Sequence, residues 1–476
     1  MTHPAETSLF SLRAIVVLGV GVSFAAQLSA QETPPKPEPP AYTLLRQNED
    51  WSKFRSSDSD CLFDRLKHID LTNGGEVWMS MGGRLDTRFE AWDGFGFGAT
   101  NPGNSDSFLL SKLMLHTDLH LGERVRVFVE GRSAQATERE LPGRRRALDM
   151  DTIDLFQGFV DLSLPFGDGD SVRLRVGRQS FLFGNQRLVS PLPWVNVWNA
   201  WDGASLGLRV GGWSIESFFT QFVQVDETDW NRADSDRTLY GVYATLPAPK
   251  GGRGLDLYVL GNTRANVTVN GTSGDERRHT LGFRSFGALG EGNDGELEAA
   301  WQTGEVGDSS VSAWFASGVL GHRFADVSLT PRLFVGLDAA SGDDRAGGSV
   351  GTFHQIFPLG HAYFGYVDAV GRQNVAAAQL GVQLQLAPKT MLTATGHAFR
   401  LMDRSDALYA VNGTVSRNGL SSSDVGQEVD LLLTHRFSRH FDAYLGYSHL
   451  FTGSGLNGTG PTEDQDFAYL GAGLVF

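Results

Sequence analysis

The sequence has one cysteine, few lysines and no long hydrophobic run, and these shortages exclude several classes of protein. A single cysteine among 476 residues excludes a disulfide framework and any metal or iron–sulfur centre built from several cysteines. Because no run of about 18 apolar residues is present, a helical membrane protein is excluded as well. With 40 basic residues, 55 acidic residues and a net charge of -15, nucleic acid is not expected as the main partner.

The N-terminus has the three parts of a secretory signal peptide. Arg13 precedes the apolar stretch 14–26, and Leu28-Ser29-Ala30 supplies small residues for cleavage. We therefore expect residues 1–30 to be a signal peptide, in preference to a buried core helix. Residues 31–75 are expected to form a Pro-rich spacer, beginning QETPPKPEPP, followed by a polar periplasmic segment.

From Glu76 onward, apolar and polar residues alternate with a period of two. In the first segment Leu85 and Phe89 share one face, while Arg84 and Arg88 share the other. Such alternation is typical of a strand with one apolar and one wet face. Segments of this kind predict about eighteen strands of roughly 9–11 residues each. Their expected centres are Gly83, Met114, Val127, Phe159, Arg173, Leu206, Phe218, Val242, Tyr258, Gly282, Ala299, Ser317, Val335, Leu380, Ala394, Leu431, Leu445 and Leu470.

The lengths of the connections between these strands favour one architecture. Short links such as 211–212 and 387–389 are expected to alternate strictly with long polar links such as 182–201 and 342–372. Short turns at one rim and long loops at the other are typical of an outer-membrane barrel. The predicted fold is therefore all-β, a transmembrane antiparallel up-and-down β-barrel over residues 76–476. A soluble β-sandwich would not explain the regular difference in loop length, and a β-helix would need a fixed repeat.

The last predicted strand ends in an apolar stripe that reaches the final residue. Leu470, Ala472, Leu474 and Phe476 lie on one face, which would face lipid in a closed barrel. A C-terminal Phe on such a stripe resembles the signal read by the barrel-assembly machinery. We therefore expect a bacterial outer-membrane location, with lipid and that machinery as partners.

Two loop segments carry a family resemblance. The stretch 177–203 contains Gly-Arg-Gln, then Gly-x-x-Arg-Leu, spaced tryptophans and Asp-Gly, and the second stretch is FHQIFPLGHAYFGYVDAVGRQN, 353–374. Together with 426–431 and 447–453, these segments resemble the alginate-export family of outer-membrane porins. The resemblance implies an eighteen-stranded barrel that conducts an acidic polysaccharide through an Arg-rich constriction. Within the matched loop it singles out Arg178, Arg187 and Asp202.

The basic residues comprise 34 arginines and 6 lysines. Arginine pairs bidentately with carboxylates and stays charged in a confined pore. Strand parity places a set of arginines on the polar face, where they would line the lumen. This set is Arg84, Arg88, Arg126, Arg132, Arg173, Arg175, Arg209, Arg284 and Arg332. Arg178 breaks the parity of Arg173 and Arg175, so it is expected at a strand end or bulge.

Other interpretations of these residues stay open. The lumen arginines could pair with wall carboxylates and not with a substrate. A genome-wide coding bias toward arginine is another explanation for the excess of arginine over lysine. The net charge of -15 would repel a polyanion unless the acidic residues lie on external loops. Trp194, Trp198 and Trp201 would either pack the loop, anchor at the interface or stack on sugar rings.

The sequence favours a channel without catalysis. We expect passive passage of an anionic polysaccharide such as alginate or a uronate oligosaccharide, with periplasmic export proteins as candidate partners. The alternatives are a general or nutrient-uptake porin and, less favoured, an outer-membrane hydrolase. Ser448 and His449 are adjacent on one strand and so face opposite ways. His116, Asp118 and His120 are too widely spaced on one strand to predict a metal site, and no cofactor is expected.

Overall fold

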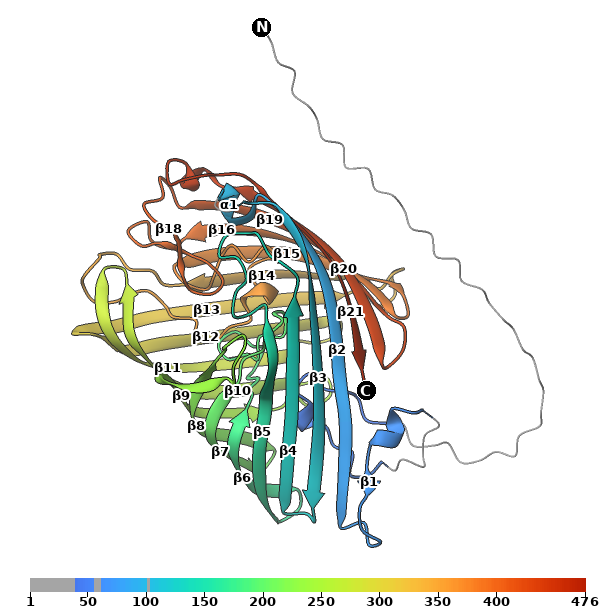
Figure 1. Ribbon diagram of the computed structural model, residues 1–476. Coiled ribbons are helices and arrows are strands. Elements are labelled where there is room, and N and C mark those ends of the chain that lie inside the picture. The colour runs from blue at the N-terminus through green and yellow to red at the C-terminus, as the bar shows by residue number, and fades with distance from the viewer. Residues whose placement is uncertain (1–38, 55–60, 101–102) are drawn as a thin grey trace. The chain divides into compact units, whose positions relative to one another are not determined.

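The computed structural model describes residues 39–54, 61–100 and 103–476. Within these residues a 19-stranded antiparallel sheet includes the two-residue strand β1 (Ile69–Asp70), which pairs with β2. The other eighteen strands form a closed barrel (Figure 1), and the closure joins β2 to β21 from Arg84↔Val475 to Asp93↔Asp466. The predicted signal peptide and residues 31–38 of the predicted spacer lie outside the described residues.

The strands follow one another around the barrel in chain order. Their bounds are β2 (Val77–Asp93), β3 (Asp106–Leu121), β4 (Val125–Ala136), β5 (Asp151–Phe166), β6 (Asp170–Gln179), β7 (Trp201–Val210), β8 (Trp213–Gln224), β9 (Arg232–Leu246), β10 (Arg253–Val269), β11 (Thr272–Ala288), β12 (Asn293–Val306), β13 (Ser309–Arg323), β14 (Arg332–Ala340), β15 (Val375–Ala387), β16 (Thr390–Leu401), β19 (Asp424–Arg436), β20 (Phe441–Thr452) and β21 (Gln465–Val475). Each of the eighteen predicted centres falls in a different one of them, so the predicted fold is confirmed.

Several short elements lie outside the barrel wall. They are the 3-10 helices η1 (Arg46–Asn48), η3 (Asp64–Leu66), η4 (Gly360–Ala362) and η5 (Ser454–Leu456), the one-turn helix α1 (Phe95–Gly98), and the strands β17 (Leu408–Tyr409) and β18 (Val415–Arg417). No helix among the described residues is long and apolar enough to cross a membrane.

The alternation of apolar and polar residues produces the two faces of the wall. Leu85, Phe89 and Leu470 are exposed on the outside, whereas Glu90 and Tyr469 are buried on the inside. A closed barrel can cross a bilayer because every strand finds a hydrogen-bonding neighbour. The outer leucines and phenylalanines are then free to face lipid.

Two details of the prediction are wrong. The strands run from 9 residues in β14 to 17 in β10, so many are longer than the predicted 9–11. The alternation of short and long links also fails between β10 and β11 and between β12 and β13, where only residues 270–271 and 307–308 intervene. The β10–β11 and β12–β13 hairpins extend beyond the ends of the neighbouring strands, since β10 pairs with β9 only as far as Arg264 and β13 pairs with β14 only from Phe315. Asn270 and Gly271 both have positive φ, as a tight hairpin turn of the favoured type requires.

The barrel has two unlike rims. The turn rim carries links such as 122–124, 211–212 and 388–389, together with the start of β2 and the end of β21. The opposite, loop rim carries the long connections 180–200, 341–374 and 402–423.

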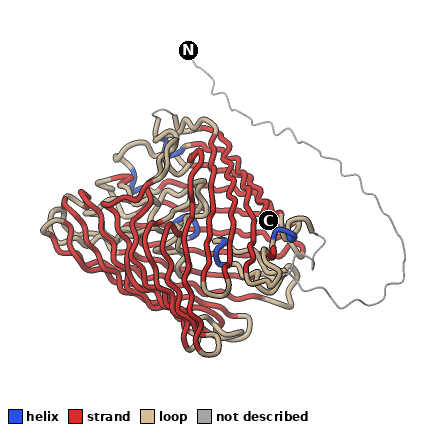
Figure 2. The backbone as a smooth tube through the Cα atoms, turned by 60° about the horizontal axis from the view of Figure 1, so that its bottom comes forward, coloured by secondary structure: helices blue, strands red, loops and turns tan. Residues whose placement is uncertain are grey.

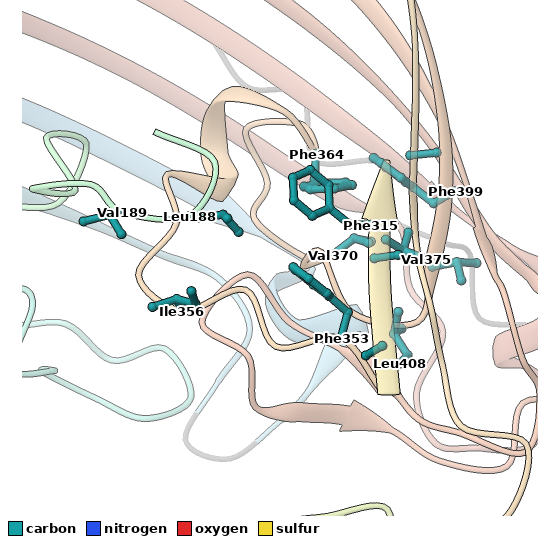
Figure 3. Close-up of a cluster of buried hydrophobic side chains, with 14 of the residues drawn as sticks. Leu188, Val189, Phe315, Phe353, Ile356, Phe364, Val370, Val375, Phe399 and Leu408 are labelled. Carbon is teal, nitrogen blue, oxygen red and sulfur yellow. The ribbon is translucent and has the colours of Figure 1, made fainter. Parts of the chain in front are cut away.

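The long loops pack inside the barrel. Loop 180–200 and loop 341–374 are joined by the parallel bridge Val189↔Phe357 and by the hydrogen bond from Leu359 N to Gln186 O, 2.9 Å. Figure 2 shows loop segments crossing the space enclosed by the strands. Their side chains form a buried apolar cluster with the wall, in which loop residues Leu188, Val189, Phe353, Ile356, Phe364 and Val370 meet wall residues Phe315, Val375 and Phe399 (Figure 3).

The N-terminal segment 39–54 also lies in the lumen. Leu45 packs in a cluster with Met114 and Trp198. Arg46 donates to Gly83 O and to Phe476 O, both at 2.9 Å. Arg126 donates to Gln47 O at 2.9 Å. The segment therefore fills part of the barrel beside β2–β5.

Candidate substrate path in the lumen

Most of the predicted lumen arginines are held by carboxylates on the same strand or on a strand one or two places away. Arg84 pairs with Asp86, and Arg88 with Glu90, each at 2.7 Å. The further pairs are Arg126–Asp118 at 2.7 Å, Arg132–Asp151 at 2.6 Å, Arg173–Glu216 at 2.7 Å, Arg175–Asp161 at 2.7 Å, Arg284–Asp256 at 2.9 Å and Arg332–Asp294, whose Nε–Oδ2 distance is 2.8 Å. These guanidinium groups are therefore parts of wall ion pairs. Arg209 lines a lumen cavity near the turn rim.

Arg178 and Asp202 lie on the outer side of the wall. Arg178 is the penultimate residue of β6 and shares the face of Leu174 and Val176, both exposed outward. Asp202 is its directly opposed residue on β7, and Arg178 Nε lies 2.7 Å from Asp202 Oδ1. The structure thus places this pair apart from the lumen residues, at a strand end and without a bulge in β6.

Arg187 reaches across the lumen to the far wall. Its side chain is 1% exposed and lies 3.0 Å from Glu298 of β12, with Glu296 as a second partner. The ring of Tyr363, from the other long loop, is 4.4 Å from the guanidinium. Arg187 therefore anchors loop 180–200 to the opposite side of the barrel.

A second loop arginine has the same role but was not predicted. Arg372 is fully buried, pairs with Asp338 of β14 at 2.9 Å and donates to Arg187 O at 3.1 Å. It lies within the stretch 353–374 that carries the family resemblance. A single arginine in a polar loop gives no periodic signal, so only the resemblance could have drawn attention to it.

A cavity of about 410 Å³ lies between the loops and the wall formed by β2, β3, β19, β20 and β21. Its lining contains three cations, two carboxylates and a group of aromatic rings. They are Arg84, Arg88, Lys112, Asp86, Asp442, Trp194, His361, Tyr366, Tyr444 and Tyr469. We call this cavity the lumen pocket.

The cations of the lumen pocket are only partly compensated by its own carboxylates. Arg84 and Lys112 share Asp86, with Lys112 Nζ 3.4 Å from the carboxylate. Arg88 is paired by Glu90, which lies outside the lining.

Lys112 was missed as a candidate, although it lies on the same polar face as His116 and Asp118 and strand parity would have found it.

An aromatic stack forms one side of the lumen pocket. Trp194 lies under the Arg88 guanidinium at 3.8 Å and accepts its hydrogen bond at 2.6 Å through the backbone carbonyl. His361 stacks on Trp194 at 3.8 Å and on Tyr366 at 4.6 Å. Trp198 and Trp201 are both buried. Trp198 lies against Lys112, whose Nζ is 4.3 Å from its ring centre, and Trp201 is the first residue of β7. Guanidinium groups beside ring faces are suited to a solute that is both carboxylated and cyclic.

The histidines and aspartate of β3 act as wall residues. His120 lies 3.1 Å from Asp118 and stacks on Trp78 at 3.8 Å, while His116 stacks on Phe128.

Comparisons with known proteins agree with this architecture. A sequence model of the alginate export family matches residues 77–469. Among solved structures, OccK8 (OprE) of Pseudomonas aeruginosa is similar at a TM-score of 0.55 and 10% identity, covering 84% of this chain and 98% of its own. OccK11 (OpdR) of the same organism has a TM-score of 0.54 and 13% identity, covering 84% of this chain and 96% of its own. OpdK of Pseudomonas aeruginosa, solved with vanillate, has a TM-score of 0.51 and 10% identity, covering 83% of this chain and 98% of its own. No curated protein matches the chain in sequence.

Proposed function

Because this chain belongs to the alginate export family and forms an outer-membrane channel, we propose that it passes an anionic polysaccharide or uronate oligosaccharide through the bacterial outer membrane. Passage is passive and selective for charge. The lumen pocket is the observation that carries this proposal, because it combines three cations with an aromatic stack inside the barrel.

The chemistry of the lumen pocket fits a uronate unit. A guanidinium offers parallel N–H donors to a carboxylate, and a flat aromatic ring offers a face to the sugar. Arg88 and Trp194 provide both within one contact. Since Arg84, Arg88 and Lys112 already have carboxylate partners, a sugar carboxylate competes for donors rather than meeting bare charge. Each contact is then weak enough for the polysaccharide to move on to the next position.

Planar-bilayer recording tests the polyanion claim. We expect anion selectivity in the purified protein and a block of the current by polyuronate. Arg88→Gln should reduce both, whereas Arg277→Gln, an outward arginine with 63% exposure, should leave them unchanged. A cation-selective pore, or currents that ignore polyuronate, would overturn the proposal.

A nutrient-uptake porin is the second candidate, and the filled lumen favours it. Loops 180–200 and 341–374 occupy the interior, and a pocket of about 410 Å³ holds a small molecule more readily than a polymer. OpdK, one of the similar structures, was solved with vanillate, a small carboxylate. Block by a monomeric uronate or an aromatic acid, but not by the polymer, would select this candidate.

The C-terminal strand supports a proposed partner in assembly. Leu470 is exposed on the outer face of β21, and Phe476 completes the apolar stripe at the turn rim. We therefore propose the barrel-assembly machinery as the partner that reads this strand before the barrel inserts into lipid.

A further inference from the structure

Three side chains of metal-ligand type meet at the turn rim. Cys61 and Asp64 come from residues 61–68, which precede β1, and His440 comes from the turn between β19 and β20. One ligand atom from each residue lies within 4.8 Å of the other two. Cys61 Sγ and His440 Nε2 are 3.4 Å apart.

The orientation of His440 leaves Nε2 available as a ligand. Its Nδ1 lies 2.9 Å from the carbonyl oxygen of Val475. A carbonyl only accepts hydrogen bonds, so Nδ1 carries the proton and donates it. The lone pair of the neutral ring is then on Nε2, which faces Cys61. Metal-binding histidines are commonly fixed in this way, by a hydrogen bond from the second ring nitrogen to a backbone carbonyl.

Asp64 is placed as a buried carboxylate with a supporting cation. Its side chain is 3% exposed, and Arg439 lies 3.0 Å from its Oδ1. The same guanidinium nitrogen also lies 3.2 Å from Oδ2. Arg439 also donates to Pro40 O at 2.9 Å. The guanidinium therefore holds Asp64 in position beside Cys61 and His440.

Aromatic rings cover the group on one side. The rings of Phe63 and Tyr42 lie 5.1 and 5.5 Å from the His440 ring. Phe63 also stacks on Phe476 at 5.0 Å. This apolar surrounding strengthens the attraction between a bound cation and its anionic ligands.

We propose that Cys61, Asp64 and His440 form a zinc site that fastens residues 61–68 to the turn rim of the barrel. Sulfur, imidazole nitrogen and carboxylate oxygen are all ligands of zinc, and three protein ligands leave a fourth position for water. Tetrahedral bonds of roughly 2.0–2.3 Å require ligand atoms about 3.3–3.8 Å apart, and the Sγ–Nε2 distance already has this value. On binding, the thiol gives its proton to solvent and the thiolate forms the bond to zinc.

Metal titration of the full-length protein tests the site. The protein is purified in detergent without a histidine tag, with Cys61 kept reduced, and zinc affinity is measured by competition with a chromophoric chelator. Cobalt(II) serves as the spectroscopic probe. We expect one ion per chain and a thiolate-to-cobalt charge-transfer band. Cys61→Ser and His440→Gln should each weaken binding at least about 10-fold, in the range known for damaged metal sites.

A matched control and a second readout keep the result unambiguous. His322→Gln changes a partly exposed histidine elsewhere in the barrel, at the end of β13, and should bind zinc like the wild type. Zinc should also slow alkylation of Cys61 in the wild type but not in His440→Gln. If Cys61→Ser retains full affinity, or cobalt gives no thiolate band, the contact is only a hydrogen bond and the proposal fails. Neither result bears on the lumen pocket.

Discussion

The arginines inside the barrel are matched by carboxylates because an unpaired charge in a confined interior is costly. Arg187 and Arg372, each at most 1% exposed, show this most clearly. Each one connects a loop to a carboxylate of the wall. At this scale a large part of the arginine content stabilises the filled barrel. Arginines that line a cavity also face free volume, as Arg84 and Arg88 do in the lumen pocket and Arg209 does near the turn rim.

Removal of Arg187 should therefore destabilise the protein strongly. Arg187→Ala leaves Glu298 buried without its ion-pair partner, and breaking a buried ion pair in this way costs about 3–5 kcal/mol. Arg232→Ala removes an 81% exposed partner of Asp229, for which a loss of at most about 1 kcal/mol is expected. Urea-dependent unfolding in detergent measures both. Equal losses in the two variants would contradict this account.

Lys67 gives the N-terminal segment a pH dependence. It is buried and donates to Met81 O at 2.7 Å. Burial, assisted by the charge of Arg46, lowers the pKa of Lys67 from 10.5 to about 7. Between these two values the unfolded segment binds a proton that the folded one lacks, so stability rises with pH from about 7 to 10.5. Below pH 7 both states are protonated and this group causes no further change.

Hydrogen exchange over residues 61–70 measures this effect. Protection should increase from pH 7 to pH 9 in the wild type relative to Lys67→Met, compared at each pH so that intrinsic exchange rates cancel. Lys53→Met changes an exposed lysine of residues 39–54 and should behave like the wild type. A pH response that persists in Lys67→Met would assign it to another group.

At the scale of elements, strands were predictable and loops were not. The period of two is a local property, so it located every strand of the barrel wall and assigned Arg84 and Arg88 to the polar face. It also put Arg178 out of parity with Arg173, which agrees with its outward position in β6. The place of Arg187 depends instead on Glu296 and Glu298, more than 100 residues away. No periodic pattern encodes such a contact. The pattern also does not predict how far a strand extends beyond the membrane.

The docking of loop 341–374 depends on a glycine. Gly365 has φ of +79°, and a Cβ there would lie 2.3 Å from the Glu428 carboxylate, whereas Gly347 has φ of +73° and open space around it. Both alanine variants carry the same backbone strain, of about 1–2 kcal/mol. Only Gly365→Ala should also displace the loop, which Val367 N holds to Glu428 at 2.8 Å. We expect higher single-channel conductance and a lower melting temperature than in Gly347→Ala. Identical behaviour of the two variants would show that the loop does not control the path.

At the scale of the whole molecule, the average composition conceals a membrane protein. Hydrophobic residues make up 41% of the chain, but in each strand they are sorted to one side. Leu337, Leu380 and Leu445 are all more than half exposed, which would be unfavourable in water and is favourable in lipid. The barrel therefore owes its hydrophobic exterior to the order of residues and not to their proportion.

An arginine scan along one strand tests the depth of this exterior. Leu380 is 64% exposed in the middle of β15, and Leu386 is 43% exposed near its turn-rim end. Leu380→Arg should cost about 2–4 kcal/mol in lipid, and Leu386→Arg about 0–1 kcal/mol. Equilibrium folding into bilayers measures both values. A reversed order would place the bilayer midplane nearer the turn rim.

The bonds made by Arg46 have a consequence for the order in which the chain folds. Its guanidinium bridges Gly83 O in the first barrel strand and Phe476 O, and the bond to Phe476 joins residues that are 430 positions apart in the sequence. Contacts so distant in sequence are slow to form. The first described segment therefore cannot reach its final position until the whole chain has been synthesised and the seam between β2 and β21 has met. Docking of the N-terminal segment is accordingly a late event, and it marks a barrel whose closure is complete.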